Sequence, residues 1–199
     1  MENICNLYQQ SLIPNTEIVK EATDQLLSIY ENPENISLIF QVINDSSDNT
    51  IKQSALTGLY KMMNAHWKSA YNGNQNGEAI KEHLLNLFRN FKSNNLISNL
   101  LAYCFKPIIE TQGWEWSELN KFLSQTISES TLIVVSFLLK QSLENSEDLN
   151  QEIIEFCLSI LEKSLNKLIG DQSSQILQYE PKELSNAPYD IYNKTIELN

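Results

Sequence analysis

The side chains that most often carry out chemistry in proteins are few in this sequence and far apart. The two histidines are His66 and His83, and neither has a cysteine or an acid pair beside it at the spacing of a metal site. The three cysteines, Cys5, Cys104 and Cys157, form no CxxC pair, so neither a zinc site nor a redox motif is indicated. Each lies in a stretch of apolar periodicity, which predicts reduced, buried thiols in a cytosolic or nuclear protein.

Paired carboxylates give no stronger signal for catalysis. Glu115 and Glu118 lie on one turn of a predicted helix, but acidic helix faces are common in proteins without catalytic activity. The motifs GxSxG, HExxH and GxGxxG and the P-loop do not occur. We therefore expect a protein that is not an enzyme, with no catalytic residue, no metal ligand and no cofactor.

The charge of the chain restricts its partners. There are 25 acids against 14 bases, which gives a formal net charge of −11, and Arg89 is the single arginine. Such a surface repels phosphate backbones, so we expect no nucleic-acid partner. It suits a basic protein partner, although acidity that only confers solubility gives the same composition. The longest apolar run, 132–139, is far shorter than the roughly 20 residues of a membrane helix, so no membrane partner is expected.

Helices must position any functional side chain in this protein. Five glycines and five prolines in 199 residues are too few for an antiparallel sheet with many tight turns. Apolar residues recur at helical spacing nearly throughout, and although Leu132–Val135 has strand propensity, its helical neighbours favour a buried helix. The stretch Lys68–Gly77 reads as a loop, and Gly170 is placed to end the last helix. The predicted helices span 2–12, 16–30, 35–44, 49–67, 78–91, 94–110, 114–127, 130–144 and 148–169.

The order of these helices indicates repeated pairs. The first helices of successive pairs begin near 2, 35, 78, 114 and 148, at the offsets of two-helix repeats. Irregular offsets without a shared consensus favour HEAT-type repeats over other two-helix repeats. We predict an all-α fold, and specifically a HEAT-type α-solenoid (an alpha-alpha superhelix). It would comprise about four helix pairs plus one further helix over 1–170. A loose or capping tail would follow at 171–199. A plain helical bundle is the alternative.

Several segments, taken in order, resemble the N-terminal region of importin-beta-type nuclear transport receptors. The strongest is 51–67, which has Ile-Lys-Gln at its start and His-Trp at its end, at the spacing of the family. Lys52 stands where the family has an arginine, and Tyr60-Lys61 departs from its Lys-Asn. Family receptors are several times longer, so this chain is a truncated member, a fragment or a small relative. The matching segments are IVKEATDQLLSIY at 18–30, NPENISLIFQVI at 32–43, IKQSALTGLYKMMNAHW at 51–67, IKEHLLNLF at 80–88 and WSEL at 116–119.

The resemblance implies an interaction protein of nucleocytoplasmic transport, present in cytoplasm and nucleus. In the family, the N-terminal repeats bind the small GTPase Ran in its GTP form, largely through inner helices. Here the inner helices would be the second of each pair, 16–30, 49–67, 94–110 and 130–144. The candidate Ran contacts are exposed polar residues of the second of these, Lys52, Gln53, Tyr60, Lys61 and Asn64. An ordinary solvated helix face is the alternative for each of them.

Other expectations complete this interpretation. Trp67 and Trp116 are expected to pack between helix pairs rather than to contact a partner. The apolar residues of 171–199 favour a tail that folds back over helix 148–169, with contact to another chain as the alternative. We expect a monomer that binds Ran or a basic protein. The competing roles are a structural HEAT-repeat scaffold and a gene fragment without autonomous function.

Overall fold

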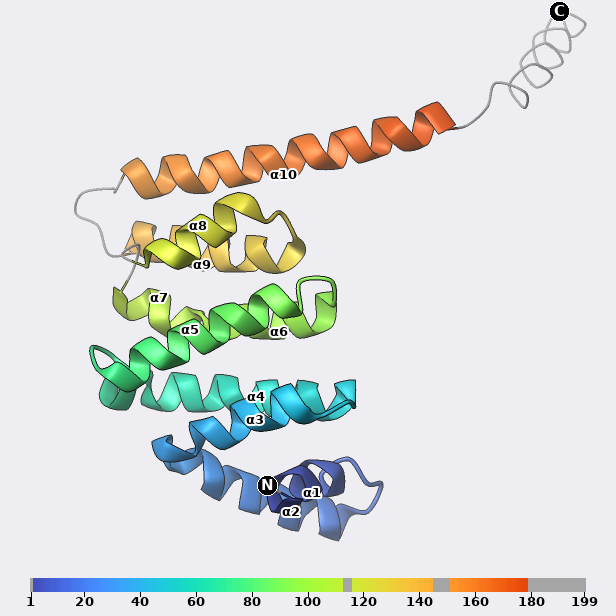
Figure 1. Cartoon of the computed structure of the whole chain (residues 1–199), viewed down its shortest axis with the longest axis vertical. Coiled ribbons are helices and arrows are strands. Elements are labelled where there is room, and N and C mark those ends of the chain that lie inside the picture. The colour runs from blue at the N-terminus through green and yellow to red at the C-terminus, as the bar shows by residue number, and fades with distance from the viewer. Residues whose placement is uncertain (1, 113–115, 145–150, 179–199) are drawn as a thin grey trace, which may run out of the picture. The chain divides into compact units, whose positions relative to one another are not determined.

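The computed structural model describes residues 2–112, 116–144 and 151–178, and these residues contain helices, turns and no strand (Figure 1). The predicted all-α class is therefore confirmed, and Leu132–Val135 lies within a helix. No helix of the described residues is long and apolar enough to cross a membrane. The helices are α1 (Glu2–Gln10), α2 (Thr16–Glu31), α3 (Ile36–Asp45), α4 (Asn49–His66), α5 (Gln75–Asn90), α6 (Asn95–Cys104), α7 (Lys106–Gln112), α8 (Ser117–Gln125), α9 (Glu129–Glu144) and α10 (Gln151–Gln178), with a 3-10 helix η1 (Pro33–Asn35) and a π-helix η2 (Trp67–Tyr71).

Side-chain amides start several of these helices. An amide oxygen at the N-cap position accepts a hydrogen bond from a backbone N–H group that has no partner within the helix. Asn15 accepts from the N–H of Glu17 at 3.1 Å at the start of α2. Asn74 and Asn94 do the same for α5 and α6, and Asp48 caps α4 with its carboxylate. The asparagine-rich composition thus sets helix boundaries.

The chain divides into two units, residues 1–160 and 161–199. Within the first unit, α1 packs on α2, α3 on α4 and α5 on α6 (Figure 1). The helices α2, α4, α6 and α9 contact one another in that order, and we call them the second row. We call α1, α3, α5 and α8, each of which directly precedes a second-row helix along the chain, the first row. In the second unit, the described residues are the part of α10 from 161 to 178.

The predicted loop at Lys68–Gly77 is largely wrong. Helix α4 continues into the π-helix η2, and α5 begins at Gln75, so only residues 72–74 form the turn. Tyr71 holds the π-helix in place because its side chain is buried and its hydroxyl donates a hydrogen bond to the carbonyl of Pro33 at 2.6 Å. Gly77 is required for this packing, since a Cβ there would collide with the Tyr71 carbonyl oxygen.

Two further helix boundaries differ from the prediction. The expected helix 94–110 is interrupted at Phe105, and α7 continues to Gln112. Pro107 explains the break, because it has no N–H to donate and its ring clashes with the carbonyl four residues earlier. Helix α10 was expected to end at Gly170 but continues to Gln178. Gly170 does not adopt the left-handed backbone of a helix end, and a glycine inside a helix costs only about 1 kcal/mol.

The tail prediction is tested only at its start. Residues 171–178, which were assigned to the tail, continue α10. The residues after 178 and the side chains after Gly170, including those expected to fold back, lie outside the described residues.

The core of the first unit contains Trp67 and Trp116, as predicted. Trp67 is 1% exposed and donates its indole N–H to the Thr111 hydroxyl at 2.7 Å. Trp116 is buried with its ring centroid 5.6 Å from that of Phe105. Both tryptophans therefore pack between helices.

The three cysteines are free thiols, as expected, but the predicted burial of Cys5 is wrong. Cys104 is completely buried and Cys157 is buried, while Cys5 is half-buried. Burial raises the pKa of the Cys157 thiol to about 11. It raises the pKa of the Cys104 thiol by more.

Candidate protein-binding surface

The five predicted contact residues lie on α4, whose buried residues include Ile51, Ala55, Leu59 and Met62. Lys61 and Asn64 are exposed, as predicted. Lys52, Gln53 and Tyr60 were also expected to be exposed, but they are half-buried. We call the solvent-facing side of α4, α6 and α9 the second-row face.

Lys52 is half-buried because it packs on an aromatic ring. Its ammonium lies 4.7 Å from the ring centroid of Phe91, the residue that follows α5. An ammonium over a ring face is attracted by the quadrupole of the ring. The Phe91 ring therefore restrains the Lys52 side chain at the edge of the second-row face.

Tyr60 is half-buried because it belongs to a row of aromatic side chains. Its ring meets Tyr103 of α6 edge to face at a centroid distance of 6.2 Å, and Tyr103 lies 5.7 Å from Phe137 of α9. One ring thus comes from each of three neighbouring second-row helices. Tyr103 is 44% exposed, so the row is accessible at its centre.

Sequence reasoning missed Tyr103 and Phe137, although a signal was present. Tyr103 follows Tyr60 by 43 residues, the offset between the second and third predicted pairs, and Phe137 follows Tyr103 by 34, close to the offset of 36 between the third and fourth. Comparing aromatic residues at the repeat period would have aligned the three rings. Asn99, one helix turn before Tyr103 on the same side of α6, was also missed. Its side-chain oxygen is buried and accepts no hydrogen bond within the described part of the chain.

Lys61 lies on the opposite edge of α4, toward α2. It lines a cavity of about 180 Å³ together with Tyr8 and Tyr30, whose hydroxyls are 3.0 Å apart. Burial raises the pKa of both tyrosines, so these hydroxyls are neutral and Lys61 supplies the charge. Gly58 lies beneath Tyr30, and a Cβ there would come within 2.5 Å of the tyrosine oxygen.

His66 has a structural role. Its Nε2 donates a hydrogen bond to the carbonyl of Tyr30 at 2.8 Å, which ties the end of α4 to the end of α2. Within the described ranges, no group of three histidine, cysteine or acidic side chains is close enough to hold a metal ion.

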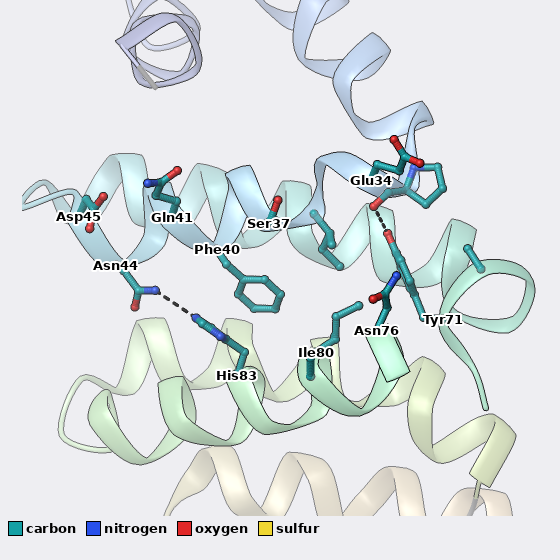
Figure 2. A pocket seen from close by; sticks show the side chains of 14 residues that line it. Glu34, Ser37, Phe40, Gln41, Asn44, Asp45, Tyr71, Asn76, Ile80 and His83 are labelled. Atoms are coloured by element: carbon teal, nitrogen blue, oxygen red, sulfur yellow. Dashed lines mark hydrogen bonds between the residues drawn. The ribbon is translucent and has the colours of Figure 1, made fainter. Parts of the chain in front are cut away.

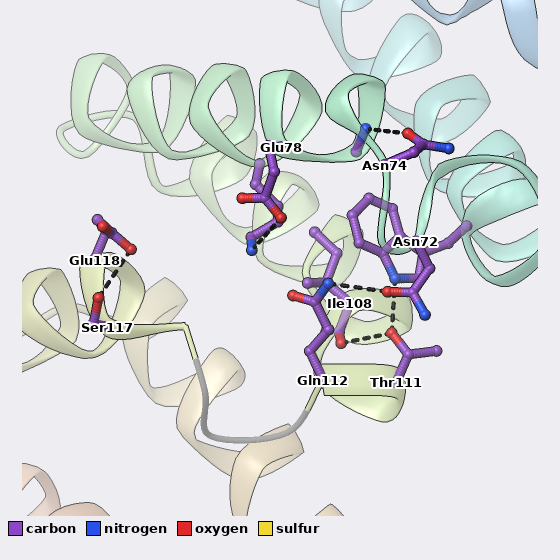
Figure 3. A network of polar contacts seen from close by, with 11 residues as sticks. Asn72, Asn74, Glu78, Ile108, Thr111, Gln112, Ser117 and Glu118 are labelled. Carbon is purple, nitrogen blue, oxygen red and sulfur yellow. Dashed lines mark hydrogen bonds and ion pairs between the residues drawn. The ribbon is translucent and has the colours of Figure 1, made fainter.

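A network of polar contacts joins the turn at 72–74 to the end of α7 (Figure 3). Gln112 donates to the side-chain oxygen of Asn72 at 3.0 Å. Nearby, the ammonium of Lys81 pairs with Glu78 at 3.0 Å and lies 5.1 Å from the Trp116 ring centroid. The polar groups of these side chains are paired with one another. The network therefore stabilises the fold rather than presenting a reactive group.

Of the two carboxylates that were considered for catalysis, Glu118 lies within the described residues. Hydrogen bonds from its own backbone N–H and from Ser117 lower the pKa of exposed Glu118, which favours its charged form. A carboxyl with a lowered pKa is a poor general acid near neutral pH. Glu115 lies outside the described residues.

The fold and the surface define an all-helical protein with a mixed aromatic, amide and lysine face. Comparison of the chain with protein-family models, with curated proteins and with solved structures finds no match.

Proposed function

We propose that this chain is a protein-binding helical-repeat module of the HEAT type, and that it binds the small GTPase Ran in its GTP form as the N-terminal part of an importin-beta-type receptor does. The observation that carries the proposal is the second-row face, where neighbouring helices present lysines, amides and a row of aromatic rings. The role would place the protein in cytoplasm and nucleus, as a monomer.

The arrangement of the helices supports the repeat assignment. The pairs α1 and α2, α3 and α4, and α5 and α6 each pack together, and the second helix of one pair contacts the second helix of the next. In repeat proteins of this kind, each unit contacts its neighbours and the row of second helices forms an extended binding surface. A scaffold or a truncated relative without transport activity would have the same helix order and is the alternative.

The composition of the second-row face supports protein binding. Tyrosine is enriched at the centres of protein interfaces because its ring buries a large area and its hydroxyl finds a hydrogen-bond partner. Tyr103 is exposed in this manner at the centre of the aromatic row. Lys52 and Lys61 on the two edges of α4 suit an acidic patch on that partner.

The test is a binding measurement with purified Ran loaded with a non-hydrolysable GTP analogue or with GDP. We expect the whole chain to capture the GTP form in preference to the GDP form. Lys61→Glu should weaken capture several-fold, because it reverses a charge at the edge of the face. Lys121→Glu is the matched control, since Lys121 is an exposed lysine of first-row helix α8. Equal capture of both nucleotide forms, or equal weakening by both variants, would contradict the proposal.

A further inference from the structure

A groove between the first-row helices α3 and α5 has no role in the proposal above. It encloses about 880 Å³, within the size range of ligand sites. One wall comes from η1 and α3, and the other from η2 and α5 (Figure 2). Phe40 and Ile80 face each other across it (Figure 2). The groove contains none of the residues of the second-row face.

Contacts near both ends hold the two walls in place. At one end, His83 of α5 lies 4.7 Å from the Phe40 ring and accepts a hydrogen bond from the Asn44 side chain at 3.3 Å. At the other end, the hydroxyl of Tyr71 donates to the carbonyl of Pro33. A groove fixed in this manner is formed before its occupant arrives, which reduces the ordering cost of binding.

The groove carries negative charge at its two ends. Glu34 precedes α3 and Asp45 ends it, and both side chains are exposed. Neither carboxylate forms an ion pair with a lysine or arginine within the described ranges. No lysine or arginine lines the groove, and the neutral polar lining groups include Ser37, Gln41 and Asn76. An occupant that complements this lining is apolar at its centre and cationic at its ends.

Helix geometry sets the spacing of those cations. Asp45 follows Glu34 by 11 residues, and a helical rise of about 1.5 Å per residue places their backbones roughly 17 Å apart. An extended peptide advances about 3.3 Å per residue, and alternate side chains point to the same side. Two basic residues four positions apart lie on the same side of the peptide, about 13 Å apart along its backbone, and their long side chains can extend outward to the two carboxylates. An apolar side chain midway between them lies on that side too and would face Phe40 and Ile80.

We propose that this groove binds an extended basic segment of a protein partner, in which two lysines or arginines flank an apolar residue. The inference rests on the proposed function only in treating the chain as a protein-binding module. The Ran contacts proposed above lie on α4, so variants of the two surfaces can be separated.

The test uses a fluorescein-labelled peptide of sequence Gly-Lys-Ser-Leu-Ser-Lys-Gly and the whole chain, with fluorescence anisotropy as the readout. Neutralising both carboxylates with Glu34→Gln and Asp45→Asn should weaken peptide binding about tenfold. This is toward the upper end of the free energy that two exposed ion pairs contribute. Neither change removes an apolar contact, and losing an acid at the C-terminal end of a helix is not destabilising. Ala79→Lys, at an exposed position lining the groove, should abolish binding by adding bulk and positive charge.

The matched control removes two acids elsewhere. Glu21→Gln with Asp24→Asn changes the net charge equally on α2, outside the groove, and should leave peptide binding unchanged. Equal weakening by this control would show general charge attraction and overturn the inference. So would unaltered binding by Ala79→Lys, or equal binding of a peptide with glutamates in place of lysines. The Glu34 and Asp45 variant should still capture Ran in its GTP form, so failure of either idea is visible separately.

Discussion

Replacing Trp67 with alanine removes the largest of the fully buried side chains among the described residues of the first unit. The indole packs near Tyr71 and over Gly77, and it donates its N–H to Thr111. Deletion of a large buried aromatic typically costs about 3–5 kcal/mol. The Thr111 hydroxyl still donates to a backbone carbonyl of α7, so no additional penalty arises from an unpaired group. We therefore expect Trp67→Ala to lower the free energy of unfolding by about 3–5 kcal/mol.

The assay is urea unfolding followed by circular dichroism at the helical band. With a urea dependence of about 2 kcal/mol per molar, the midpoint of Trp67→Ala should fall by roughly 1.5–2.5 M. Trp67→Phe separates the two contributions, because phenylalanine retains a ring but not the hydrogen bond to Thr111, and it should cost about 1–2 kcal/mol. A midpoint for Trp67→Ala equal to that of the unmodified chain would refute the packing described here and make the indole a candidate contact with a partner.

Two other predictions concern the same region and the tyrosines. Gly77→Ala should destabilise the chain by about 1–3 kcal/mol in the same urea assay, because its Cβ would collide with the Tyr71 carbonyl oxygen. Gly73→Asn should cost less, because Gly73 has a positive φ that asparagine tolerates. An unchanged midpoint for Gly77→Ala would contradict the close packing. Stability should also fall as pH rises above about 10, the ordinary pKa of tyrosine, because burial raises the pKa of Tyr8 and raises that of Tyr71 to about 12. The unfolded chain then releases protons that the folded chain retains, so alkali favours unfolding. Tyr71→Phe should reduce this pH dependence. If the free energy of unfolding depends on alkaline pH equally in the variant and the parent, Tyr71 does not contribute in this manner.

The helices could largely be predicted from the sequence because apolar periodicity is a local signal. The stripe that ends at Trp67 placed the indole in the core, and helical neighbours correctly outweighed the strand propensity of Leu132–Val135. The π-helix could not be predicted in the same manner. Its segment has loop composition, and it is held by the hydrogen bond of Tyr71 to Pro33, a residue 38 positions away.

The candidate surface was predictable only in part. The helix wheel of α4 placed Lys61 and Asn64 in solvent, since their exposure depends on α4 alone. The half-burial of Lys52 and Tyr60 depends on Phe91 and Tyr103, which come from other parts of the chain. The groove between α3 and α5 depends on the distance between two first-row helices, and no single segment carries that information.

The amide caps have a consequence for the conditions under which the helices persist. An asparagine side chain does not titrate, and a hydrogen bond accepted by its neutral oxygen is not screened by salt as an ion pair is. The first turns of α2, α5 and α6 are held in this manner by Asn15, Asn74 and Asn94. Acid and salt alter the repulsion among the 25 acidic side chains of the chain, but they leave these three helix starts with the same hydrogen bonds.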